Sequence, residues 1–266
     1  MITFHPGAEE KLESFTPENT SLVTDFDGTV ISGASQNSFS VFIDILGTEY
    51  AEKARRLYSI FRPHEANHEL DIERKKMIME RWWKNHLWLF AKTPLTQDHL
   101  TDKLIQNLVL RKGMYSLISG FNENAIPTMV FSAGVAQVID MVLERDFGNQ
   151  HNIEVAANRL SFSPQWINNG TQGAPIHVVN KTDRDFPHLF SEQIQKRTHV
   201  IVAWDSLSDS QMVTSIPIER RLMIGFLNKS NDSDRKSFGE KFDIVVESSE
   251  CDGWLAEILL NQIWIK

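Results

Sequence analysis

Short apolar runs that each end in a polar loop recur along this chain, and they constrain its fold more than any other feature. The clearest are residues 21–24, 127–131 and 199–203, each bounded by turn-forming or polar residues. Two more, at 221–226 and 242–246, follow with helix-like segments between them. Short runs of this kind are typical of buried strands, and their alternation with helices is typical of a parallel sheet. The sequence therefore predicts an α/β fold with a doubly wound, Rossmann-like parallel sheet.

The interval between the first and second runs is too long for a simple crossover helix and contains no clear strand. Residues 72–90 are rich in Met, Trp and Leu among charged residues, and residues 100–114 show a second helical pattern. We therefore expect a helical cap formed by residues 35–120, inserted into a core formed by residues 1–34 and 121–266.

Composition and net charge limit the kinds of molecule that we expect this chain to bind. The 266 residues are 41% hydrophobic, enough for one sizeable core with a second small lobe. A net charge of -8 without a long basic run argues against binding a nucleic-acid polymer. Cys251 is the only cysteine, and neither a signal-like start nor a membrane-length apolar stretch is evident. We expect a cytoplasmic monomer that binds a small phosphorylated molecule and no membrane.

Two aspartates directly follow the first run, in the sequence Asp25-Phe26-Asp27-Gly28-Thr29. In an extended chain, residues two apart point to the same side, and Gly28 permits a sharp turn afterwards. Two carboxylates this close are tolerable only with a cation between them or a shared proton, which suggests a magnesium site or an acid/base pair. Aspartate is also well suited to turns and helix caps, so the doublet alone leaves these alternatives open.

The full pentad after an apolar strand resembles the first motif of the haloacid dehalogenase-like phosphatase superfamily. In that superfamily, the first aspartate attacks phosphorus, and the second protonates the leaving group and then activates water. The resemblance implies these roles for Asp25 and Asp27. It also implies a Mg²⁺ ion held by the Asp25 carboxylate, the main-chain carbonyl of Asp27 and a later aspartate.

The remaining motifs of that superfamily occur in the expected order, each after or near a predicted strand. A lone serine or lysine is usually a solvated surface residue, so the order of the motifs carries the inference. The resemblance implies phosphate binding by Ser132, Ala133 and Gly134, pairing of Lys181 with the phosphate and the nucleophile, and completion of the metal shell by Asp205 and Asp209.

Three segments, residues 79–86, 131–135 and 175–183, further resemble the pyrimidine 5'-nucleotidase family, of the cytosolic 5'-nucleotidase III type. The likeness extends over most of the chain. It implies magnesium-dependent hydrolysis of a nucleoside 5'-monophosphate, with a pyrimidine base expected, through an aspartyl-phosphate. It also implies that Glu80, on a cap helix, hydrogen-bonds the base.

The cap segment also has a purely structural interpretation. Trp82, Trp83 and Trp88 would then pack in the core of the cap, and Glu80 would pair with Lys84 one helical turn later. For the tryptophans we favour this interpretation, and for Glu80 we favour the role in base recognition.

The chain departs from the family pattern at three positions. Trp204 and Ser208 stand where the family usually has glycines in its fourth motif, and Arg81 stands where an aromatic residue is common. A tryptophan at position 204 must either point into the sheet or crowd the metal site.

Two further functional hypotheses stay open: a phosphatase for another small phosphate ester, such as a sugar phosphate or phosphoserine, and a catalytically weakened protein that binds phosphate or nucleotide.

Overall fold

The computed structural model describes residues 1–67, 69–148, 152–165, 168–181, 192–193, 196–207, 213, 216–229, 231–247 and 252–264. The strands are β1 (Ile2–Phe4), β2 (Thr20–Thr24), β3 (Thr128–Val135), β4 (Ile153–Asn158), β5 (Leu160–Phe162), β6 (Asn168–Thr171), β7 (His199–Trp204), β8 (Arg221–Leu227) and β9 (Ile244–Glu247). The helices are α1 (Ala8–Leu12), α2 (Val41–Ala66), α3 (Ile72–Ala91), α4 (Asp102–Ile105), α5 (Met114–Glu123), α6 (Ala136–Phe147), α8 (Asp232–Gly239) and α9 (Asp252–Trp264). The loop Phe26–Val30 is labelled η1.

A seven-stranded sheet forms the core, in the order β1-β9-β8-β7-β2-β3-β4. All neighbouring strands run parallel except β1, which pairs antiparallel with β9 at one edge. The five strands expected from apolar runs all form, and the predicted doubly wound, mostly parallel sheet is confirmed. Two sheet strands were not expected, β1 and β4, and β5 and β6 form a separate antiparallel pair.

The order of the strands places a topological switch beside β2. From β2 the chain moves outward through β3 and β4, then returns to place β7 on the other side of β2. In open α/β sheets, ligands bind at the carboxyl ends of strands next to such a switch. The polar loops after β2, β3 and β7 therefore converge at one edge of the sheet.

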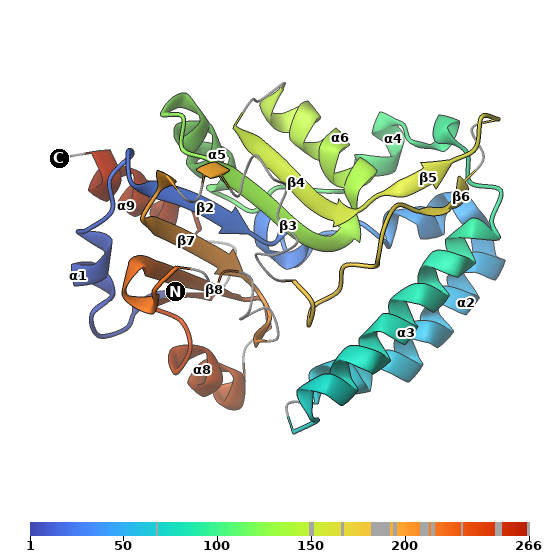
Figure 1. The fold of residues 1–266 in the computed structure, drawn as a ribbon, viewed down its shortest axis with the longest axis horizontal. Helices are drawn as coiled ribbons and strands as arrows, with labels where there is room; N and C mark the ends of the chain where they lie inside the picture. Colours follow the sequence, from blue (N-terminus) through green and yellow to red (C-terminus); the bar gives the residue numbers. More distant parts are fainter. Residues whose placement is uncertain are drawn as a thin grey trace.

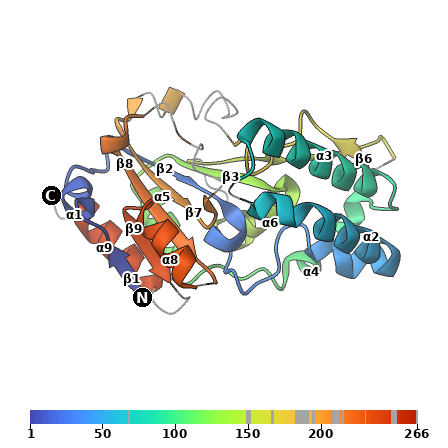
Figure 2. The ribbon, with the colours of Figure 1, turned by 90° about the horizontal axis from the view of Figure 1, so that it is seen from below.

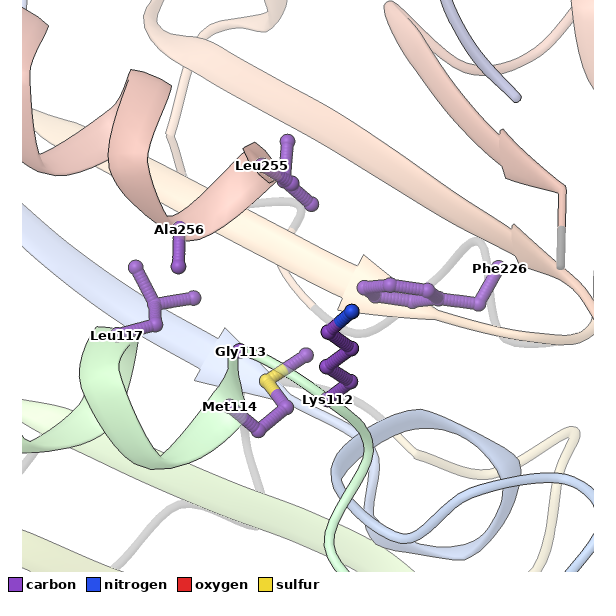
Figure 3. Close-up of a pocket in the computed structure, with 7 residues that line it drawn as sticks. All are labelled: Lys112, Gly113, Met114, Leu117, Phe226, Leu255 and Ala256. Atoms are coloured by element: carbon purple, nitrogen blue, oxygen red, sulfur yellow. The ribbon is translucent and has the colours of Figure 1, made fainter. Parts of the chain in front are cut away.

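Helices α1, α5 and α9 cover one face of the sheet (Figure 1). Their apolar side chains pack on residues of β7 and β8 such as Ile201 and Ile224. Between α5, α9 and β8, the side chains of Leu117, Ala256 and Phe226 enclose only about 10 Å³ of space (Figure 3). A void of that size holds at most one water molecule, so this contact is packing and not a ligand site.

The long helices α2 and α3 lie side by side and project from the core (Figures 1 and 2). The helix expected at residues 72–90 is α3, and Asp71 caps it by accepting a hydrogen bond from the Arg74 amide. Helix α2 is interrupted at Gly47, whose φ of 76° is left-handed. The separation of a cap at residues 35–120 stays a prediction; α5, which begins inside that range and ends at Glu123, packs on α9 of the core.

The helix expected over residues 100–114 was wrong. Only α4 forms there before α5 begins at Met114, and the chain between them returns to the core. The Arg111 amide donates to the carbonyl of Val30, and Leu110 bridges to Ile31. These contacts with the core override the local helical pattern.

Several large apolar side chains are exposed on α2 and α3: Tyr58, Ile60, Ile72, Met77 and Trp88. The exposed Trp88 contradicts the expectation that all three cap tryptophans are core residues, whereas Trp82 is buried as expected. None of the helices in the described ranges combines the length and apolarity needed to cross a bilayer.

Candidate active site

Asp25 directly follows β2, at the carboxyl end of the central strand. Its amide donates to the carbonyl of Ala203 on β7, which fixes the start of the loop. The Lys181 ammonium donates to Asp25 Oδ1 at 2.7 Å, and the two side chains are only 1% and 9% exposed. This buried ion pair brings together two predicted catalytic residues that are 156 positions apart. It holds a carboxylate at a fixed place at the switch point.

Asp27 lies two residues further on, and Ser38 holds both of its carboxylate oxygens. The Ser38 amide donates to Oδ1 at 2.8 Å and the Ser38 hydroxyl donates to Oδ2. Desolvation raises the pKa of Asp27 to about 6; the Ser38 hydrogen bonds oppose this rise and the negative charge of Asp25 adds to it. A carboxyl group with a pKa in this range can both give and accept a proton near neutral pH.

Ser132, Ala133 and Gly134 form the end of β3 beside this pair of aspartates. Ser132 is buried, and its hydroxyl accepts a hydrogen bond from the Gly134 amide at 2.9 Å. A Cβ atom at Gly134 would lie 2.0 Å from the Ser38 hydroxyl and 3.0 Å from Asp27 Oδ2. The loop can approach Asp27 this closely only because residue 134 is a glycine.

Asn158 connects this loop to the segment that carries Lys181. Its side-chain amide donates to the carbonyl of Ala133 at 2.7 Å and to that of Ile176 at 2.8 Å. Its Oδ1 accepts from the Ile176 amide. The loop at the end of β3 and the segment that carries Lys181 are thus held in register by one buried side chain.

Asp205 follows β7 and lies against the Asp25-to-Thr29 loop. Asn228, just after β8, donates from Nδ2 to Asp205 Oδ2 and to the carbonyl of Gly28, both at 2.9 Å. Gly28 has a φ of 77°, and a Cβ atom there would lie 2.1 Å from Asp205 Oδ2. Asp209, the other predicted metal ligand of this motif, lies outside the described residues, as does Ser208.

Arg111 supports the same loop from behind. Its guanidinium donates to the carbonyl of Gly28 at 2.6 Å, to that of Thr29 at 2.9 Å and to Asn228 Oδ1 at 2.5 Å. Its Cζ lies 4.6 Å from the centroid of the Phe226 ring. These contacts fix the turn that follows the two aspartates.

Trp204 points into the sheet and does not crowd the site. It is buried in the apolar cluster that also contains Phe238 and Phe242, and its ring centroid lies 4.8 Å from that of Phe242. Side chains alternate along a strand, so Trp204 and Asp205 point in different directions. The departure from glycine at this position therefore fills the core.

A cleft of about 690 Å³ opens beside this edge of the sheet and is lined by both the core and α2. Its size is that of a typical small-molecule site. The charged and amide side chains that line it are Asp27, Gln36, Asn37, Arg62, Glu65, Asp205, Asn228, Lys229 and Asp234.

Glu80 lies on α3 and forms an ion pair with Lys84 at 3.6 Å, with 39% of its side chain exposed. Burial lowers the pKa of His177 to about 4, and the negative charge of the Glu80 carboxylate opposes part of this shift. Glu80 therefore faces the segment that leads to Lys181. Recognition of a base by Glu80 stays a prediction.

The predicted ligands that the structure describes fit a magnesium ion in kind, because Mg²⁺ prefers oxygen ligands. Within the described ranges, no group of three acidic or histidine side chains gathers closely enough to hold a metal unaided. Mg²⁺ usually binds through one or two carboxylates and completes its shell with water and substrate phosphate. Asp205, held by Asn228 against the loop of Asp25 and Asp27, provides that arrangement.

Four residues that support the site were not expected from the sequence: Ser38, Arg111, Asn158 and Asn228. Asn228 could have been predicted from the sequence, because it closely follows the strand expected at 221–226, and ligand-binding residues of such sheets lie after the carboxyl ends of strands. Ser38 and Arg111 lie in the segment expected to form the cap, and their contacts depend on where that segment returns to the core. No local pattern marks them.

The family model for pyrimidine 5'-nucleotidase (UMPH-1) matches residues 26–264. The chain belongs to this family. With its mostly parallel sheet and inserted helices, it is a 5'-nucleotidase of the haloacid dehalogenase-like fold, a phosphoric monoester hydrolase. The resemblance noted from three short segments is thereby confirmed.

Curated relatives extend over most of the chain. A 7-methylguanosine phosphate-specific 5'-nucleotidase of Drosophila melanogaster is 28% identical over 86% of this chain and 76% of its own. A putative cytosolic 5'-nucleotidase 3 of Caenorhabditis elegans is 26% identical over 85% of this chain and 65% of its own.

Among solved structures, cytosolic 5'-nucleotidase IIIB bound to cytidine has a TM-score of 0.85 at 25% identity, covering 98% of this chain and 93% of the other. A phospho-aspartyl intermediate analogue of phosphoserine phosphatase has a TM-score of 0.59 at 17% identity, covering 91% and 97%. The second likeness shows the shared fold alone.

Proposed function

We propose that this nucleotidase hydrolyses nucleoside 5'-monophosphates through a phosphorylated Asp25. The observation that carries the proposal is the buried Asp25–Lys181 pair at the carboxyl end of the central strand, beside the Ser38-bound Asp27. The ammonium orients the Asp25 carboxylate, and it offers a positive charge to the phosphate that the carboxylate attacks.

The reaction divides into two steps. In the first, an Asp25 oxygen attacks phosphorus, the bond from phosphorus to the 5' oxygen breaks, and the leaving oxygen takes the proton of Asp27. In the second, Asp27 takes a proton from water, the water oxygen attacks phosphorus, and the bond to Asp25 breaks. The pKa of about 6 for Asp27 suits both transfers.

Mg²⁺ would be held by the Asp25 carboxylate, the Asp27 main-chain carbonyl, Asp205 and Asp209, and it would neutralise charge on the transferring phosphoryl group. Ser132, Ala133 and Gly134 would bind the phosphate oxygens next to Lys181. Glu80 would hydrogen-bond the base.

Two classes of base are candidates. The family's description supports a pyrimidine, whereas the Drosophila relative is named for 7-methylguanosine phosphate. The aromatic side chains of Phe39 and Trp83, with ring centroids 4.7 Å apart, belong to the cap and provide stacking surface of a kind that suits either base. We place the protein in the cytosol as a monomer; the name of the nematode relative supports the compartment.

Phosphate release tests the proposal directly. We would incubate the protein with cytidine, uridine, guanosine and 7-methylguanosine 5'-monophosphates, and with a sugar phosphate and phosphoserine, each with Mg²⁺ and with a chelator. Release confined to nucleotides and lost with the chelator is expected. Release from the other esters alone would move the substrate to another class, and no release from any would favour the binding-protein hypothesis.

A further inference from the structure

The turn between the core and α2 joins the site to the cap through two adjacent residues, Ser38 and Phe39. Asn37 Oδ1 accepts hydrogen bonds from the amides of Phe39 at 3.1 Å and Ser40 at 2.7 Å, and the Ser40 hydroxyl accepts from the Asn37 amide at 2.8 Å. The turn is thus rigidly closed on itself. A displacement of one of its residues displaces the others.

On the core side, Ser38 contacts both Asp27 and the loop at the end of β3. It is fully buried, its amide and hydroxyl donate to the two oxygens of Asp27, and its hydroxyl accepts from the Val135 amide at 3.4 Å. Gly134 packs closely on this hydroxyl, since a Cβ atom at position 134 would lie 2.0 Å from it.

The two hydrogen bonds also distinguish the oxygens of Asp27. A backbone amide only donates, so Oδ1, bound to the Ser38 amide, must remain an acceptor. Oδ2 instead contacts the Ser38 hydroxyl, and a hydroxyl can either donate or accept. Oδ2 is therefore the oxygen of Asp27 that can carry a proton, and Ser38 fixes its position.

On the cap side, Phe39 packs against α3. Its ring centroid lies 4.7 Å from Trp83, 5.0 Å from His86 and 5.7 Å from Phe90, all on that helix. A continuous path of contacts therefore runs from α3 through Phe39 and Ser38 to Oδ2 of Asp27.

We propose that Ser38 is a positioning residue that aims the Asp27 proton at the leaving oxygen, and that Phe39 makes this alignment depend on the seating of α3. The cap then controls proton delivery as well as access. This rests on the proposed function insofar as Asp27 is taken as the proton donor.

Leaving groups of different basicity give a direct test. A nucleoside or simple alkyl alkoxide needs a proton to depart, whereas nitrophenolate departs as a stable anion. We would measure kcat/KM, which reports the steps up to departure of the leaving group, for cytidine 5'-monophosphate, a simple alkyl phosphate and p-nitrophenyl phosphate. The variants are Ser38→Ala, which keeps the backbone amide, Phe39→Leu, and the control Ser59→Ala, which removes a hydroxyl that donates to the Arg56 carbonyl within α2.

Ser38→Ala should lower kcat/KM for the two alkyl esters by about 10- to 100-fold and for the nitrophenyl ester by less than about 3-fold, since general acid catalysis contributes about 10²- to 10⁴-fold. Phe39→Leu should show the same asymmetry with smaller losses, and Ser59→Ala should resemble the wild type. Equal losses on alkyl and nitrophenyl esters, or none on alkyl esters, would overturn the proposal. A wild-type protein active on the simple esters but not on the nucleotide would defeat the proposed function and leave the test of Ser38 intact.

Discussion

Replacement of Lys181 by methionine should strongly destabilise the protein, because it leaves the Asp25 carboxylate buried without its partner. At the 2.7 Å separation of the pair, an effective dielectric of about 20 gives an attraction of about 6 kcal/mol. The cost of desolvating the two ions cancels part of that attraction, and breaking a buried pair from one side typically costs about 3–5 kcal/mol. We expect Lys181→Met to lower the free energy of unfolding by that amount, and the double variant Asp25→Asn/Lys181→Met to recover at least about 2 kcal/mol of it.

Urea unfolding followed by far-ultraviolet circular dichroism, with a chelator present, measures these differences. Lys53→Met is the matched control. Its pair with Glu49 is equally short at 2.6 Å, but the side chains are 57% and 83% exposed and solvent screens the attraction, so the loss should be much smaller than for Lys181→Met. The reasoning fails if Lys181→Met and Lys53→Met lower the free energy of unfolding by the same small amount. It also fails if the losses of Asp25→Asn and Lys181→Met, measured singly, simply add in the double variant.

Three further predictions concern neighbouring features. Burial lowers the pKa of His86 to about 4, so below the ordinary histidine pKa of 6.5 the unfolded chain binds more protons than the folded one. From pH 7 to pH 5, the free energy of unfolding should therefore fall by about 2 kcal/mol more in the wild type than in His86→Gln. Equal pH dependence in the two proteins would contradict this. Gly134→Ala should lower kcat/KM for nucleotides by at least about 10-fold, because the added methyl would lie 2.0 Å from the Ser38 hydroxyl; wild-type kinetics would show that the loop adjusts freely. Trp204→Gly, which restores the family's residue, should lower the free energy of unfolding by about 3–5 kcal/mol, measured by thermal unfolding, without raising kcat. A gain in activity would mean that the indole does crowd the site.

The strands that position the site were predictable because each is a short apolar run bounded by turn residues. β1 was missed because it has only three residues and lies at an edge. β4 was missed because Glu154 and Asn158 interrupt its apolar pattern. The helix expected over 100–114 fails for a different reason: Arg111 is bound to the carbonyls of Gly28 and Thr29, a contact that no local pattern reports.

The same distinction holds in the site. Asp25, Asp27 and Lys181 were predictable because motif order and strand ends together specify where their side chains meet. Ser38 and Arg111 act through the path of the chain between motifs, which a single sequence does not reveal. Their contacts became evident only when the turn before α2 and the return of the cap segment were placed against the loop after β2.

Trapping the phosphorylated enzyme tests the central claim most directly. Wild-type protein and Asp25→Asn would each be mixed with a nucleoside 5'-monophosphate carrying radiolabelled phosphate and Mg²⁺, quenched in acid and digested for mass spectrometry. The account predicts acid-stable label on the peptide that contains Asp25 in the wild type, with neither label nor turnover in Asp25→Asn. Undiminished turnover in Asp25→Asn, or label on another residue, would contradict it.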